Sequence, residues 1–131
     1  MTEDKSTALL SNGLPQPPIP QRLRELLKDY PDHLERLQEA LNYAFDGPKP
    51  VRGSASHVFE QVIWALEGRL ETFFREANAE LRVAEANGEG DAIARVRQKK
   101  SAMGFASSIN DGMANLDEVW NYIQEHNEVL R

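Results

Sequence analysis

The feature that most constrains the fold is a short hinge, Gly88-Glu89-Gly90, between two long amphipathic stretches. Apolar residues recur at spacings of three and four on both sides of it, which is the period of an α-helix with one buried face. The pattern predicts one helix over about 56–87 and another over about 91–130. Because the glycines interrupt the helical pattern, we expect an antiparallel hairpin whose apolar faces meet.

The two apolar stripes also predict which levels of the hairpin lie side by side. If the turn is centred on Glu89, facing residues have numbers that sum to about 178, since both helices have the same rise. Three levels then face each other: Val58 and Phe59 with Trp120 and Val119, Leu66 with Gly112, and Phe73 with Phe105.

One segment of the second helix is weak. Residues 108–112 read Ser-Ile-Asn-Asp-Gly, and poor helix formers gather there. The apolar spacing continues in phase to residue 130, which favours one unbroken helix. The alternative is a kink or a short break at 108–112.

Two shorter helices are predicted before the hairpin, over about 21–30 and 31–45. Isolated helices of this length are marginal in water, so we expect both to pack on the hairpin. The chain is therefore predicted to be all-α. It divides into a flexible, proline-rich segment over 1–19 and a single helical domain over 20–131.

The proline-rich segment favours an extended path, because proline cannot join a helix interior. Its prolines are Pro15, Pro17, Pro18 and Pro20. We interpret it as a stiff strap that lays Leu14 and Ile19 along the hairpin. The alternative is a PxxP motif that docks in the aromatic groove of another protein.

Composition narrows the classes of partner. Twenty-one acidic against fifteen basic residues give a net charge of −6, which disfavours nonspecific binding to nucleic acid. No apolar run is long enough to span a membrane. Cysteine is absent, and the N-terminal residues lack the pattern of a secretory signal, so we expect a cytoplasmic protein.

The sequence carries no catalytic signature, metal-ligand cluster or phosphate-binding loop, so we predict no catalytic site, metal site or cofactor. A di-iron bundle would need glutamate three residues before histidine. The residues three before His33, His57 and His126 are Tyr30, Ser54 and Ile123.

A local basic cluster near the hinge spreads around the helix rather than along one face, which favours ion pairs over a phosphate-binding stripe. Its members are Arg95, Arg97, Lys99 and Lys100, and the expected acidic partners across the hairpin are Glu76, Glu80 and Glu85.

Trp64 is the candidate interface residue. It lies off the apolar stripe, and its neighbours at helical spacing are Glu60, Glu67 and Gly68, with Glu71 one turn further on. Because leaving a tryptophan in water is unfavourable, something should cover it. Three structures could cover Trp64: the short N-terminal helices, a second copy in a symmetric dimer, or a different, basic protein.

From these features we expect a non-enzymatic protein–protein interaction module, a homodimer that presents a preformed helical face. A more specific hypothesis is an immunity- or antitoxin-like neutraliser of a basic protein. Two alternatives remain. One is a small ligand-binding protein or enzyme with a pocket near Trp64, Trp120 and Tyr122 that uses Asn110, Asn115, Asn127 and His57. The other is a structural subunit of a larger assembly.

Overall fold

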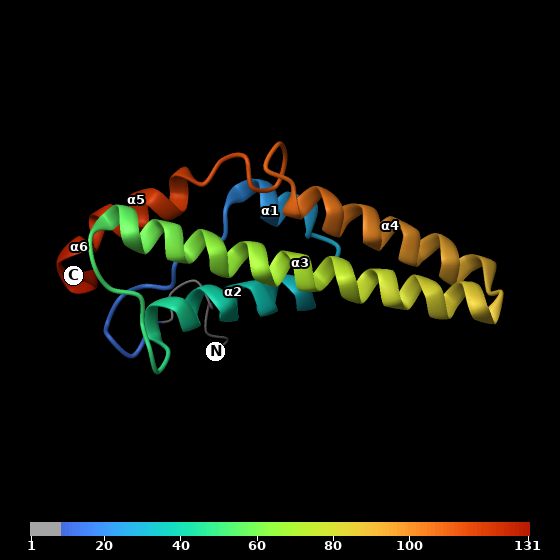
Figure 1. Ribbon diagram of the computed structural model, residues 1–131, viewed down its shortest axis with the longest axis horizontal. Coiled ribbons are helices and arrows are strands. Elements are labelled where there is room, and N and C mark those ends of the chain that lie inside the picture. Colours follow the sequence, from blue (N-terminus) through green and yellow to red (C-terminus); the bar gives the residue numbers. More distant parts are fainter. Residues whose placement is uncertain (1–8) are drawn as a thin grey trace, which may run out of the picture.

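The antiparallel hairpin forms the long axis of the molecule (Figure 1). In the computed structural model, which describes residues 9–131, helix α3 (Ala55–Asn87) is followed by α4 (Gly90–Ser107). The hydroxyl of Ser54 caps α3 by accepting a hydrogen bond of 3.2 Å from a backbone N–H of its first turn. Gly88 ends α3 with φ +67°, a left-handed conformation that favours glycine. The predicted hairpin is confirmed.

Contacts between the two sides of the hairpin confirm the predicted register. The ring centroids of Phe59 and Trp120 lie 5.1 Å apart, Lys99 Nζ lies 3.0 Å from Glu80 Oε1, and a Cβ built on Gly104 would lie 3.5 Å from the Phe74 ring. The residue numbers of each pair sum to 178 or 179.

The register sets Phe73 and Phe105 at one level, but their side chains lie in different environments. Phe73 is fully buried and packs edge-on against His33 at a centroid distance of 4.8 Å, whereas Phe105 is 56% exposed. Ala106 takes the buried position on α4. Each residue turns a helix by about 100°, so burying Ala106 rotates its neighbour Phe105 toward solvent.

The single helix expected over 91–130 is wrong, and the break falls where poor helix formers gather. The chain leaves α4 after Ser107, crosses a non-helical segment over 108–116, and returns as α5 (Asp117–Glu125) and α6 (Asn127–Leu130).

The break is a compact turn closed by its own backbone. The N–H of Gly112 donates to the Phe105 carbonyl at 3.0 Å, and the N–H of Met113 donates to the Ser108 carbonyl at 2.8 Å. Gly112 is buried, and a Cβ there would lie only 2.6 Å from the Cα of Ala106. The turn therefore has room for glycine alone at this position.

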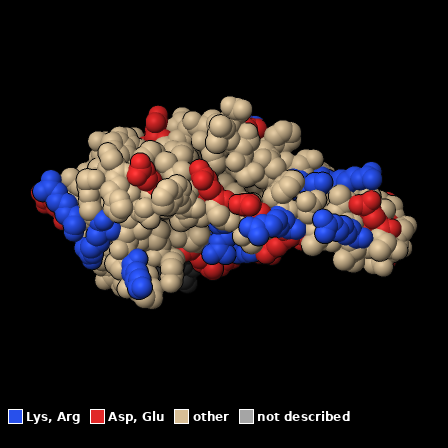
Figure 2. Space-filling view, in the orientation of Figure 1, with Lys and Arg blue, Asp and Glu red and all other residues tan. Residues whose placement is uncertain are grey.

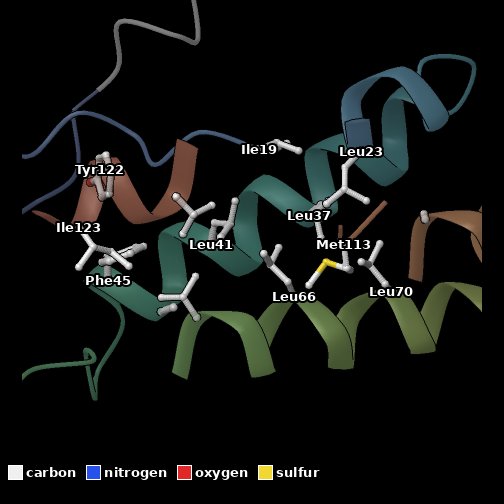
Figure 3. Packing of buried hydrophobic residues seen from close by; sticks show 14 of the residues in the cluster. Ile19, Leu23, Leu37, Leu41, Phe45, Leu66, Leu70, Met113, Tyr122 and Ile123 are labelled. Atoms are coloured by element: carbon white, nitrogen blue, oxygen red, sulfur yellow. The ribbon is translucent and has the colours of Figure 1, made fainter. Parts of the chain in front are cut away.

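The two predicted N-terminal helices are present as α1 (Gln21–Leu26) and α2 (Pro31–Asp46), and both pack on the hairpin. Helix α2 lies along α3, and α1 lies against α4. Figure 3 shows leucines of α2 pointing toward leucines of α3. Four of them, Leu37, Leu41, Leu66 and Leu70, have at most 1% of their surface exposed.

The proline-rich segment runs as a strap from the C-terminal end of α2, where the Ser11 N–H donates to Asp46 Oδ2 at 3.0 Å, to the start of α1. Leu14 and Ile19 are buried, as the strap interpretation predicts. Its carbonyl groups are held from two helices: Tyr122 Oη of α5 donates to the Pro15 carbonyl at 2.6 Å, and Gln38 Nε2 of α2 donates to the Pro17 carbonyl at 2.8 Å. The flexible segment expected over 1–19 falls in part on residues 1–8, which lie outside the described residues.

Replacement of Leu70 by aspartate tests the packing of the α2 leucines against the α3 leucines, which we call the seam. Leu70 is fully buried, so Leu70→Asp should lower the free energy of unfolding by more than about 4 kcal/mol, because it removes apolar packing and buries an unpaired charge. Glu89→Ala is the control, since this side chain is exposed at the turn. Urea unfolding would measure both. Equal losses in the two variants would contradict the assigned core.

Alkaline pH tests the strap contact. Burial raises the pKa of Tyr122 to about 12, and the charge of Asp46 adds to the shift. The unfolded phenol ionises near pH 10, so between about pH 10 and 12 the unfolded chain loses a proton that the folded chain keeps. Stability should therefore fall over this range, and Tyr122→Phe should make the fall shallower. Parallel stability–pH curves for the wild type and Tyr122→Phe would contradict the raised pKa assigned to Tyr122 in the folded chain.

Candidate interaction surface

Trp64 lies on the side of α3 that faces away from the core, and 64% of its surface is exposed. Two residues turn a helix by about 200°, which sets Trp64 opposite the buried Leu66. Helices α1 and α2 pack near the buried side of α3, so cover by the N-terminal helices, one of the three readings, is wrong.

The other four candidate residues surround Trp64 on the same side of the helix. Glu60, Glu67 and Glu71 are exposed. Gly68 is exposed as well, with nothing within 4 Å of the place where a Cβ would stand. We call these five residues, with Trp64 at their centre, the Trp64 face. It is a flat apolar ring system flanked by carboxylates.

A second patch lies on the hairpin where α3 and α4 run side by side, at the base of the arm formed by residues 81–97 around the turn (Figure 1). A hollow of about 660 Å³ opens there, and we call it the arm hollow. Its apolar lining comes from Phe74, Leu81, Gly104 and Phe105, and its basic rim from Arg97 and Lys100. Lys100 Nζ lies 5.8 Å from the centroid of the Phe74 ring.

Sequence reasoning missed this hollow. Phe74 and Phe105 stand at the edges of the two apolar stripes, and their numbers sum to 179, so the register already sets them at one level. Gly104 beside them removes bulk. The sequence therefore held the information, but Phe74 and Phe105 were both interpreted as additional core residues.

Charge changes sign along the exposed side of α3. Figure 2 shows acidic atoms over its N-terminal half, and further along, toward the arm, mostly basic atoms with an acidic group among them. The acidic residues are Glu60, Glu67 and Glu71, and the basic ones are Arg75 and Arg82 of α3 with Arg97 and Lys100 of α4. The two signs meet at the Glu71–Arg75 ion pair, whose atoms lie 3.6 Å apart.

The expected pairing of the basic cluster across the hairpin is confirmed for Lys99 with Glu80. Glu76 has a different partner, Arg36 of α2, which donates two hydrogen bonds of 2.7 and 2.9 Å. These bonds hold the pKa of the Glu76 carboxyl below its usual range. Both ion pairs join helices on the side of α3 that α2 covers, so they leave the Trp64 face unaffected.

The polar side chains considered for a pocket near the tryptophans lie at or close to the surface. Of four surface hollows on the described part of the chain, none is lined by Trp64 or Trp120. Among the side chains considered for a pocket, Asn110, Asn115 and His57 are exposed and Asn127 is half-buried. Within residues 9–131 no group of three histidine, aspartate or glutamate side chains has the spacing to hold a metal ion.

His33, another histidine considered for chemistry, is half-buried. His33 packs between Tyr30 and Phe73, and burial lowers its pKa, with the charges of Lys99 and Arg36 adding to the effect. This environment is that of a packing residue at the junction of α2 and the hairpin.

None of the helices described is both long and apolar enough to cross a bilayer.

Comparison of the chain with protein-family models, curated proteins and solved structures finds no match.

Two glycines of this region should respond to alanine with opposite signs. Gly68 lies within exposed helix with open space around it, so Gly68→Ala should raise the free energy of unfolding by about 0.5–1 kcal/mol. Gly112→Ala should lower it, because the new methyl group would overlap the backbone of Ala106. Urea unfolding of both variants checks this. A change of the same sign in both would contradict the geometry of the turn.

Proposed function

We propose that this protein is a non-enzymatic protein–protein interaction module that docks through the Trp64 face. The observation that carries the proposal is the exposure of Trp64, 64% of whose surface meets solvent on a regular helix. Tryptophan buries a large apolar area on binding and is enriched among the residues that dominate binding energy.

The helix behind Trp64 supports the same proposal. Leu66 and Leu70, on the opposite side of α3, are locked in the core. The backbone that carries Trp64 is therefore held before any partner arrives, and little conformational entropy is lost when it binds. A preformed surface of this kind suits recognition of another folded protein.

The carboxylates of the Trp64 face would steer an approaching partner toward it. Glu60, Glu67 and Glu71 have no apolar cover, so they attract a positively charged surface toward Trp64 at long range. In the neutraliser version of the proposal, that surface belongs to a basic protein whose activity is blocked on binding. Such binding should weaken as salt concentration rises.

Replacement of the tryptophan tests the proposal. Trp64→Ala should leave the unfolding transition close to that of the wild type, since the side chain is exposed, and should abolish retention of the partner when the tagged protein is used for affinity capture from its host. Tyr43→Ala is the matched control, because Tyr43 is an aromatic residue of α2 with 66% of its surface exposed. Equal retention by all three proteins would contradict the proposed docking face.

A further inference from the structure

We infer that the partner of the Trp64 face is a second copy of this chain, packed antiparallel so that each Trp64 enters the arm hollow of the other copy. The inference rests on the proposed function, because it takes the Trp64 face as a docking surface. It adds the identity of the partner and the geometry of the pair.

The spacing of the two patches along α3 allows this exchange. Trp64 lies 10 to 17 residues before Phe74 and Leu81, which line the hollow, so the patches are about 15–25 Å apart on one helix. A two-fold axis perpendicular to α3 near Glu71 brings each Trp64 level with Asn78, between Phe74 and Leu81 of the other copy. This is the self-complementary contact of a symmetric dimer.

The hollow offers an indole ring suitable contacts. Its floor is the Phe74 ring and the Gly104 backbone, and Phe105 stands half-exposed at its edge. Lys100 on the rim already lies over an aromatic face, 5.8 Å from the Phe74 centroid. A second ring placed beside it gains the same cation–π attraction. Gly68, one turn from Trp64, lets the two α3 helices approach closely.

The same two-fold axis pairs opposite charges. It sets Glu60 level with Arg82 of the other copy, and Glu67 level with Arg75. Arg97 and Lys100 lie on the rim of the hollow, on the arm side of the axis. Near the axis itself, Glu71 lies 3.6 Å from its own Arg75, and both side chains are exposed. Glu60 and Glu67 of each copy therefore meet arginines of the other, while Glu85 lies beyond them toward the tip of the arm.

This charge pattern distinguishes a second copy from a different, basic protein. A uniformly basic surface would be attracted by Glu60 and Glu67 but repelled by Arg75 and Arg82 on the same side of α3. Only a surface that reverses sign along its length fits both halves. The chain itself carries such a surface, presented by the antiparallel arrangement.

Sedimentation equilibrium of the full chain over a range of concentrations tests the inference. The wild type should have twice the mass of one chain, and Trp64→Ala should weaken the dimer at least about 100-fold while its circular dichroism spectrum stays that of the folded wild type. Tyr43→Ala, on the outer side of α2, should remain dimeric.

Charge reversal tests the geometry separately. Glu60→Arg and Arg82→Glu should each weaken self-association about tenfold, because each places like charges opposite each other twice in the dimer. An equimolar mixture of the two variants should restore the wild-type mass, since position 60 of each chain then faces a position 82 of opposite charge in both contacts of the mixed dimer. No restoration, with both single variants weakened, would overturn the antiparallel arrangement.

Two further outcomes separate this inference from the proposed function. A wild-type chain that stays monomeric at every concentration, or a dimer that Trp64→Ala leaves intact, would overturn the inference. If the monomeric chain still retains a different protein through Trp64, the proposed function stands and only the second copy is wrong. If Trp64→Ala changes neither self-association nor capture, both fail.

Discussion

Leu66 and Leu70 of α3 pack against Leu37 and Leu41 of α2, with Met113 from the turn after α4 beside them, and all five are buried (Figure 3). This seam holds elements that have no stability of their own. Helices α1 and α5 have 6 and 9 residues, which is too short for a helix in water. They are helical because the seam and the strap give their apolar sides a surface to cover. The exposed side of α3 is rigid for the same reason.

The hairpin and its register were predictable, because both follow from local periodicity and from the glycines at residues 88 and 90. The break after Ser107 was predictable only as an alternative. Met113, Val119 and Ile123 are buried on the far side of it, but Ile109, which carries the apolar spacing through the break, is 74% exposed. Periodicity shows which residues would share one side of a helix, whereas the hydrogen bonds of the backbone between them decide whether the segment is a helix. The close approach of Gly112 to Ala106 is a tertiary contact that no local pattern contains.

The candidate interaction surface was likewise predictable only in part. The exposure of Glu60, Glu67 and Glu71 around Trp64 agrees with the sequence pattern, because their spacing alone turns them away from the apolar stripe. The arm hollow was not predicted, because the apolar pattern of one helix does not show how many other helices pack against its apolar side. Phe73 is covered by His33 of α2, whereas the adjacent Phe74 is turned by about 100° around α3, is only partly buried and lines the arm hollow. The direction of each side chain around α3, relative to the helices packed on it, thus decides which apolar side chains remain available for contact.

The turn between α3 and α4 stands at the end of the arm, far from the strap, the seam and the Trp64 face (Figure 1). Its middle residue, Glu89, is exposed, and its side chain caps nothing. Chain inserted there enters and leaves through neighbouring positions of a tight hairpin and displaces no packed side chain. The tip is therefore a natural attachment point for a graft, such as a fluorescent domain or an epitope, that reports on the molecule without touching the parts that hold it together.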